Sequence, residues 1–192
     1  MKKIIIIGAG GHGRSVAEAI QLGNEFEIIG FLDDVWPKET ELWGLPIYGN
    51  THELEHCRAL ADWVVVAIGN NKIRRELMRK LIVMGYKLAT IAHPAALISP
   101  SAVLGSGSVV MAGAIIGTES KLGIGVIINA GASVDHHCQI GDYGHLGVNA
   151  CMAGGSALGE EAWLQAGSAI GYGVRISDGQ VILPGTGVSH NE

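Results

Sequence analysis

Residues 110–146 read VMAGAIIGTESKLGIGVIINAGASVDHHCQIGDYGHL, a stretch in which every sixth residue is aliphatic. Glycine often follows the aliphatic residue, and a small residue often lies four positions after it. The spacing extends in both directions without a break, so that fifteen consecutive six-residue repeats fill the second half of the chain. The aliphatic series is Ile98, Leu104, Val110, Ile116, Leu122, Ile128, Val134, Ile140, Leu146, Met152, Leu158, Leu164, Ile170, Ile176, Ile182 and Val188.

A spacing of six residues between aliphatic positions fits neither an α-helix nor an ordinary β-hairpin strand. An amphipathic helix repeats every 3.6 residues, and a hairpin strand alternates for only a few residues before its turn. Six residues suit a short strand followed by a corner. The small residue and the aliphatic residue two positions after it, such as Ala132 and Val134, would then both point inward. Successive coils would then hydrogen-bond to one another and share one narrow core.

The composition excludes several classes of protein. A chain of 192 residues that is 48% hydrophobic and 16% charged folds around a core. Its net charge of −5 argues against a nucleic-acid partner, because phosphate binding needs a basic face. Residues 1–90 contain 11 basic and 11 acidic side chains, whereas residues 91–192 contain 2 and 7. An anionic ligand therefore meets cations mainly in the first half of the chain.

The cysteines and the hydropathy indicate the compartment. Cys57, Cys138 and Cys151 lie far apart and form no C-x-x-C pair, which fits a reducing environment rather than a disulfide framework or a zinc site. The opening apolar run breaks at Gly8, which is too early for an export signal. No stretch is long enough to span a bilayer. We expect a cytoplasmic protein without a membrane span.

The first ninety residues have the pattern of an α/β domain. Apolar runs predict strands over residues 3–7, 27–32 and 63–68, and helices are expected after Gly13 and over residues 72–84. GAGGHG at residues 8–13 matches G-x-G-x-x-G between strand and helix, and Asp33 follows about twenty residues later. This motif brings backbone N–H groups to a phosphate and a carboxylate to a ribose, so it suits NAD or any other nucleotide. A nucleotide-sugar is favoured, because the domain is short and the repeats offer no hydride-acceptor site.

The repeats resemble the hexapeptide-repeat acyltransferases, and the two halves together resemble the NeuD/PglD-type sugar acyltransferases. The resemblance is carried by GAGGHG at 8–13, FLDD at 31–34, AIGNNKIR at 67–74, HPAALISPSAVLG at 93–105 and VDHHCQIGDYGHLG at 134–147. It implies an α/β N-terminal Rossmann-like domain with a parallel sheet over residues 1–92. A left-handed parallel β-helix of hexapeptide repeats, with eighteen residues per coil, is implied over residues 93–192.

The resemblance also implies a function. Such enzymes use acetyl-CoA as cosubstrate, without a metal, to acetylate the amino group of a nucleotide-linked amino sugar of the 4-amino-4,6-dideoxy type. They act as homotrimers with active sites between subunits. The resemblance assigns His136 as general base and His145 to acetyl-CoA. It assigns the nucleotide-sugar to Gly10, Gly11, His12, Asp33, Asp34, Asn70 and Lys72.

The repeat register independently supports a role for His136. This residue lies two positions after the inward Val134, so its side chain points outward from a corner. An imidazole is suited to accept a proton from an attacking amine near neutral pH. Attack is expected to be direct, because Cys138 occupies a small inward position and Cys151 has no evident base.

Relatives of this type place a glutamate after the catalytic histidine, where this chain has His137. Glu119 precedes His137 by eighteen residues, so we expect it one coil away and able to supply the missing carboxylate. Asp135 is a nearer competitor. By the same arithmetic Gly154 and Gly155 stack on His136 and His137, which leaves space for the pantetheine arm. His145 lies half a coil from His136, so the two can serve one site only across subunits.

Three alternatives remain open at this point. O-acetylation of a sugar such as sialic acid would use the same base. The protein could also be a non-catalytic nucleotide-binding scaffold, because a fold does not imply a function. Finally, histidines on trimeric β-helices can bind zinc, as in the γ-type carbonic anhydrases, although the spacing of His136, His137 and His145 does not resemble that family's.

Overall fold

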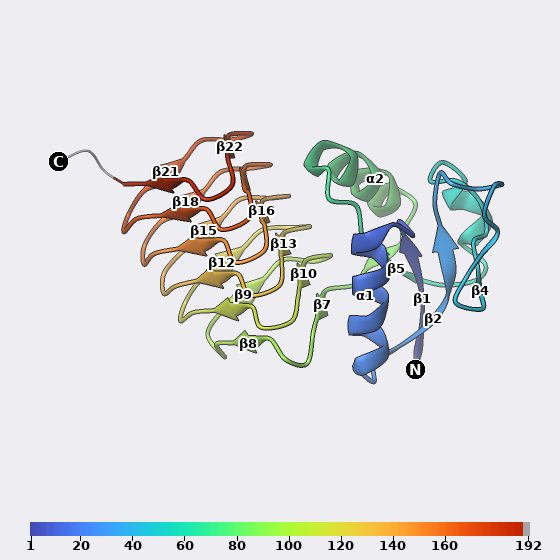
Figure 1. Cartoon of the computed structure of the whole chain (residues 1–192). Helices are drawn as coiled ribbons and strands as arrows, with labels where there is room; N and C mark the ends of the chain where they lie inside the picture. Colours follow the sequence, from blue (N-terminus) through green and yellow to red (C-terminus); the bar gives the residue numbers. More distant parts are fainter. Residues whose placement is uncertain (190–192) are drawn as a thin grey trace. The chain divides into compact units, whose positions relative to one another are not determined.

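The computed structural model describes residues 1–189, without the side chain of residue 56. These residues form two compact units, Met1–Ile91 and a second that begins at Ala92 (Figure 1). The first unit contains a parallel sheet with the order β2-β1-β5-β6. Its strands are β1 (Lys2–Ile7), β2 (Phe26–Leu32), β5 (Trp63–Val66) and β6 (Lys87–Leu88). Ile4 to Ile7 of β1 are fully buried, as expected for a central strand covered on both faces.

Two helices pack on this sheet. Helix α1 (Gly11–Leu22) connects β1 to β2 and buries Val16, Ala17, Ala19 and Ile20. Helix α2 (Asn71–Val83) connects β5 to β6 and buries Arg74, Leu77, Met78 and Leu81, a stripe at helical spacing. The connection between β2 and β5 contains the antiparallel pair β3 (Glu41–Leu42) and β4 (Leu45–Pro46) and a short 3₁₀ helix, η1 (Leu54–Cys57).

The second unit is a left-handed parallel β-helix built from two-residue strands that form three sheets. Face 1 contains β7 (Ile91–Ala92), β10 (Val109–Val110), β13 (Ile127–Ile128), β16 (His145–Leu146), β19 (Trp163–Leu164) and β22 (Val181–Ile182). Face 2 contains β8 (Leu97–Ile98), β11 (Ile115–Ile116), β14 (Ser133–Val134), β17 (Cys151–Met152), β20 (Ala169–Ile170) and β23 (Gly187–Val188). Face 3 contains β9 (Val103–Leu104), β12 (Lys121–Leu122), β15 (Gln139–Ile140), β18 (Ala157–Leu158) and β21 (Arg175–Ile176).

Each strand pairs with the strand eighteen residues away, as in the pairing of Ser133 with Cys151 and of Val134 with Met152. The core of the solenoid consists of the aliphatic series together with small inward residues such as Ala132 and Cys138. This confirms the expected fold class. The solenoid starts one strand earlier than the aliphatic series, because β7 pairs with β10 and places Ala92 in the register of Val110.

The element boundaries in the first unit differ slightly from the expectation. Helix α1 begins at Gly11, inside the glycine motif, rather than after Gly13. Strand β5 ends at Val66, two residues before the expected end. The first shift shortens the loop after β1, and the second lengthens the loop after β5. Within residues 1–189 no helix is long and apolar enough to cross a membrane.

Candidate active site

The sheet of the first unit has a topological switch point between its two central strands. The chain leaves β1 through α1 toward β2, and it leaves β5 through α2 toward β6, in the opposite direction along the sheet. In open α/β sheets the crevice beyond the carboxyl ends of such strands is where ligands bind. Here that edge is formed by the loops at residues 8–10 and 67–70.

The four glycines of the motif fall into two pairs. Gly8 has a φ of +108°, and a Cβ there would lie 2.8 Å from the carbonyl oxygen of Ala67, while a Cβ on Gly13 would overlap the carbonyl oxygen of Gly8. Gly8 and Gly13 are therefore required by packing. A Cβ on Gly10 or Gly11 would meet nothing within 4 Å. These two glycines leave space in front of the amino terminus of α1, where N–H groups favour an anion.

Asp33 and Asp34 hold this edge together. The Ala9 N–H donates to Oδ2 of Asp33 at 2.6 Å, and the Val35 N–H donates to Oδ1 at 2.8 Å. Asp33 thus fixes the glycine loop from the end of β2. The backbone N–H and the hydroxyl of Thr51 both donate to Oδ1 of Asp34, at 2.9 and 2.7 Å. The backbone hydrogen bond is the main reason that the pKa of Asp34 is lowered.

The loop after β5 is held by α2. Asn70 caps this helix, because its side-chain oxygen accepts a hydrogen bond from the Ile73 N–H at 3.1 Å. Lys72 is exposed in the first turn. Arg74 is fully buried, and its guanidinium donates to the carbonyl oxygens of Ile68 and Gly69, at 2.9 and 3.3 Å. Arg74 is not among the residues predicted for this site, although its place on the apolar stripe of α2 is a signal for its burial.

His12 lies in the first turn of α1 with its Nε2 atom buried and without a hydrogen-bond partner among the described residues. Burial, and to a lesser extent the Arg74 cation, lowers the pKa of His12 from 6.5 to about 4. The imidazole is therefore neutral at physiological pH.

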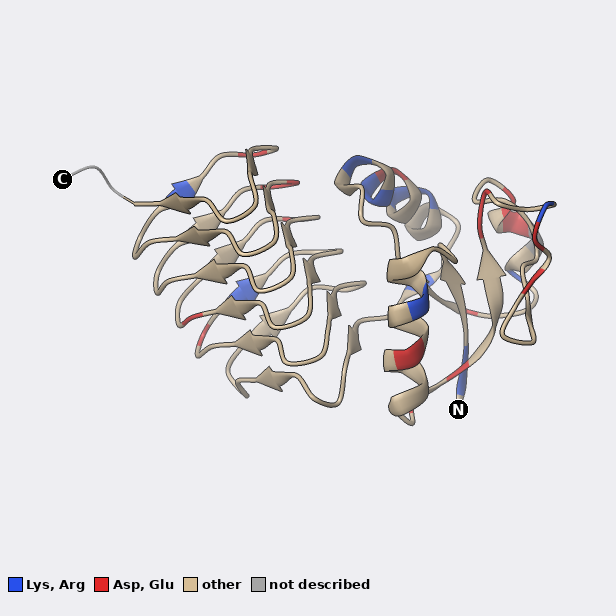
Figure 2. Cartoon of the chain, in the orientation of Figure 1, with Lys and Arg blue, Asp and Glu red and all other residues tan. Residues whose placement is uncertain are grey.

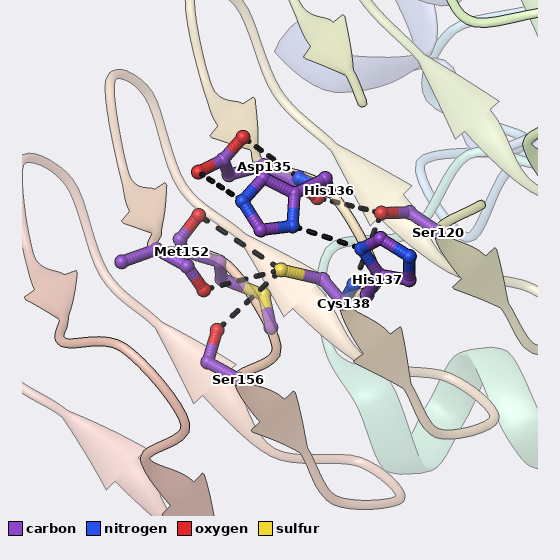
Figure 3. A network of polar contacts seen from close by, with 8 residues as sticks. Ser120, Asp135, His136, His137, Cys138, Met152 and Ser156 are labelled. Carbon is purple, nitrogen blue, oxygen red and sulfur yellow. Dashed lines mark hydrogen bonds and ion pairs between the residues drawn. The ribbon is translucent and has the colours of Figure 1, made fainter. Parts of the chain in front are cut away.

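The second cluster lies at a corner of the solenoid, between β14 and β15 (Figure 3). The His136 side chain is 53% exposed, as the register predicts, and points away from the core. Its Nδ1 lies 2.9 Å from Nδ1 of His137, and its Nε2 lies 3.7 Å from Oδ2 of Asp135. Oδ1 of Asp135 accepts the His136 backbone N–H at 2.7 Å.

Glu119 reaches this cluster from the preceding coil. Its Oε2 lies 3.1 Å from Nε2 of His137, so the pairing predicted from the eighteen-residue register is present. The four side chains form a series in which Glu119, His137, His136 and Asp135 each face the next.

Neighbouring coils hold the corner on both sides. The Ser120 hydroxyl donates to the carbonyl oxygen of Asp135 at 2.6 Å and accepts the Cys138 N–H at 3.1 Å. On the other side, the Gly155 N–H donates to the carbonyl oxygen of His136 at 3.0 Å. A Cβ on Gly154 would lie 2.5 Å from Cε1 of His136, so the imidazole occupies space that any larger residue at 154 would fill.

Cys138 belongs to the core. It is fully buried, and its Sγ lies 3.3 Å from the carbonyl oxygen of Ala153 and 3.5 Å from the Ser156 hydroxyl. Figure 3 shows the thiol on the inner side of the corner, turned toward Met152 and Ser156. This position agrees with the expectation that Cys138 packs the interior.

His145 lies in β16 on face 1, whereas His136 lies at the corner that joins faces 2 and 3. The His145 side chain is only 6% exposed, and its ring stacks on that of Trp163 from the next coil, with centroids 5.1 Å apart and planes at 11°. The structure therefore does not group His145 with His136. Among the described residues, no three His, Cys, Asp or Glu side chains are arranged to hold a metal ion.

Comparisons with known proteins identify the family to which the chain belongs. Residues 3–81 match the family described as the PglD N-terminal domain. The structure of PerB from Caulobacter crescentus, in complex with CoA and GDP-perosamine, superposes with a TM-score of 0.86 at 35% identity, covering 97% of this chain and 91% of that one. This chain belongs to the PglD-type family of sugar acetyltransferases.

Two further relatives extend the PglD-type comparison. The acetyltransferase domain of PglB from Neisseria gonorrhoeae FA1090 has a TM-score of 0.79 at 37% identity, covering 98% of this chain and 97% of that chain. The UDP-N-acetylbacillosamine N-acetyltransferase of Bacillus subtilis (strain 168) is 35% identical over 115 residues, or 58% of this chain. The match spans only 52% of the length of that curated relative.

The structure of this PglD-type chain brings the predicted residues together in two places. The edge of the sheet collects the first set, namely Gly10, Gly11, His12, Asp33, Asp34, Asn70 and Lys72. The solenoid corner collects the second set, namely Glu119, Asp135, His136, His137, Gly154 and Gly155.

Proposed function

We propose that this protein transfers the acetyl group of acetyl-CoA to the amino group of a nucleotide-linked amino sugar. The observation that carries the proposal is the exposed imidazole of His136, held at a corner of a PglD-type solenoid between the carboxylate of Asp135 and the His137–Glu119 pair. PerB, which binds CoA and GDP-perosamine in its structure, supports the same chemistry.

In the proposed reaction His136 acts as the general base. Nε2 of His136 accepts a proton from the sugar amine while the amine nitrogen forms a bond to the thioester carbonyl carbon. The tetrahedral intermediate then collapses, the carbon–sulfur bond breaks, and the proton passes from the imidazolium to the departing thiolate. Asp135, 3.7 Å from Nε2, would stabilise the imidazolium while it is charged. Direct transfer is supported by Cys138, whose thiol is buried in the core and not available as a nucleophile.

We assign the nucleotide-sugar to the carboxyl edge of the first unit. The open space before Gly10 and Gly11 suits a diphosphate, and the exposed Lys72 adds a cation to that edge. His12 and Asn70 line the same loops, while Asp33 and Asp34 fix the loops and keep further lone pairs for ribose hydroxyls.

We assign the acetyl-CoA arm to the glycine side of the corner. A Cβ on Gly155 would meet nothing within 4 Å, so the backbone there is open to a pantetheine chain, whereas the space at Gly154 is taken by the His136 ring, which the absence of a side chain at 154 allows to lie against the backbone. The family resemblance adds His145 to the donor site. Because His145 is on face 1, it serves the same site as His136 only if copies of the chain adjoin, which is why we propose a homotrimer. The dispersed cysteines support the proposal that it acts in the cytoplasm.

An assay of CoA release tests the proposed function. UDP-, GDP- and dTDP-linked 4-amino-4,6-dideoxy sugars would each be incubated with acetyl-CoA, and free thiol would be measured with a disulfide reagent. At least one amino sugar should release CoA, and His136→Asn should lower kcat by about 10²–10⁴-fold without changing the thermal shift that the nucleotide causes.

Two results would contradict the proposal. Acetylation of sialic acid but of no amino sugar would favour an O-acetyltransferase. Nucleotide-dependent stabilisation without any CoA release would favour a binding scaffold. The wild-type protein with the matching 4-hydroxy sugar nucleotides is the control for amine selectivity.

A further inference from the structure

The geometry points to Glu119 as a positioning residue for His136: we propose that Glu119, acting through His137, fixes the tautomers of both imidazoles so that Nε2 of His136 keeps a free lone pair. This inference rests on the proposed function for its catalytic meaning. Its structural content, a defined tautomer at His136, stands on the contacts alone.

The donor and acceptor sites of the four groups determine the direction of the hydrogen bonds. A carboxylate only accepts, so Nε2 of His137, 3.1 Å from Oε2 of Glu119, carries a proton. A neutral His137 then has its lone pair on Nδ1, which accepts a hydrogen bond from Nδ1 of His136 over 2.9 Å. With its proton on Nδ1, a neutral His136 has its lone pair on Nε2, the nitrogen that faces away from His137.

Asp135 does not determine which nitrogen of His136 carries the proton. Its Oδ1 is occupied by the His136 backbone N–H at 2.7 Å, and its Oδ2 is 3.7 Å from Nε2, which is beyond hydrogen-bond distance. A carboxylate at that distance attracts the imidazolium after proton uptake but does not require a proton on Nε2 beforehand. Glu119 therefore acts on Nε2 of His137 before proton transfer, whereas Asp135 acts on Nε2 of His136 after that nitrogen has taken up the proton.

The backbone gives a second, independent reason to connect Glu119 with His137. Both have left-handed conformations, with φ of 57° and 58°, at the same corner of adjacent coils. The next coil has Gly155 at this position, with φ of 69°. A left-handed residue with a side chain is less favourable than glycine, and at this corner two adjacent coils carry such residues in the conformation that brings the Glu119 carboxylate against the His137 imidazole.

This conformation provides a test in which loss of function is separated from loss of fold. Glu119→Gly deletes the carboxylate and relieves the backbone, so the melting temperature should be unchanged or higher. The kcat for acetyl transfer should fall about ten- to hundredfold, with KM for both substrates within about twofold. Glu161→Gly is the matched control, because Glu161 has the same left-handed conformation, with φ of 56°, at another corner. It should retain wild-type kcat.

A double-mutant cycle tests whether Glu119 acts through His137. The variant with both Glu119→Gly and His137→Gly should be no slower than His137→Gly alone, because the carboxylate has no route to His136 once His137 is absent. Additive losses would show that Glu119 acts by another path and would overturn the proposal.

Nitrogen-15 NMR of histidine-labelled protein measures the tautomer without any substrate. Wild-type His136 should carry its proton on Nδ1, and Glu119→Gly should convert it to a mixture of tautomers. An unchanged His136 spectrum in Glu119→Gly, or wild-type kcat in that variant, would refute the positioning role. Because the spectrum requires no catalysis, it decides the proposal even if no amino sugar proves to be a substrate.

Discussion

His12 shows how a single residue can make the stability of a domain depend on pH. Its Nε2 atom is buried beside the loop held by the Arg74 cation, and its pKa is about 4 in the folded chain against 6.5 in an exposed histidine. A neutral imidazole can donate or accept a hydrogen bond at the proposed nucleotide edge without adding charge to it.

The pKa of His12 predicts acid sensitivity of the fold. Between pH 6.5 and 4 the unfolded chain binds a proton at His12 that the folded chain does not, so the free energy of unfolding falls as the pH is lowered through this interval. Wild type should lose roughly 3 kcal/mol more than His12→Gln between pH 7 and pH 4, measured by urea denaturation. Equal pH slopes for the two proteins would contradict a buried neutral His12.

Residues of the solenoid were easier to predict from the sequence than those of the first unit. The register alone predicts His136 outward, Cys138 inward and Glu119 beside His137, because each strand of the solenoid pairs with the strand eighteen residues away. The helical spacing of α2 indicates that Arg74 is buried, but its partners, the carbonyl oxygens of Ile68 and Gly69, depend on the conformation of the preceding loop, which residue spacing does not specify. The contacts of Asp33 with the glycine loop were missed for the same reason.

At the scale of elements, the amino terminus of α1 combines two requirements in one turn. Gly13 must be small because the helix passes directly over the Gly8 carbonyl, whereas Gly11 has open space around it. The motif predicted a glycine-rich turn between strand and helix. It could not separate glycines needed for packing from those that leave room for a ligand, because that difference lies in the surrounding backbone.

Two alanine variants in this turn should behave oppositely. Gly13→Ala should lower the free energy of unfolding by about 1–3 kcal/mol, because the new methyl group meets backbone that cannot move independently. Gly11→Ala should leave stability within about 0.5 kcal/mol but weaken nucleotide binding, because its methyl group occupies the approach to the helix N–H groups. Denaturation and calorimetric titration with a sugar nucleotide would measure the two effects. A reversal of this pattern would show that the open space is not the phosphate site.

At the scale of the whole molecule, positive charge is distributed unevenly. Figure 2 shows that Lys and Arg are concentrated in the first unit, above all on α2. Within the described part of the solenoid, the basic side chains are Lys121 and Arg175, both beside a groove of about 770 Å³ on face 3 that also contains Asp142, Glu160 and Asp178. Phosphates of an acyl donor therefore meet few cations on a single solenoid, which favours a site to which a second copy contributes.

Subunit complementation tests the proposed trimer. His136→Asn and His145→Ala should each be inactive, but random co-assembly on co-expression should give a population of trimers in which about a quarter of all sites combine an intact His136 from one copy with an intact His145 from its neighbour. CoA release should recover to about that fraction of the wild-type rate. No recovery in mixed trimers confirmed by mass spectrometry would mean that the two histidines act within one chain or not together. Each variant expressed alone is the control.

The distance of eighteen residues between Glu119 and His137 affects how related chains should be compared. A search for an acid directly after His136 would find none in this chain, although the Glu119 carboxylate lies 3.1 Å from Nε2 of His137, the residue at that position. In this solenoid, the neighbours of a side chain include the residues eighteen positions before and after it, which form a column of stacked positions along the coils. Alignments of such proteins should therefore be scored by column as well as by linear motif, and paired substitutions eighteen positions apart are where compensating changes should be sought.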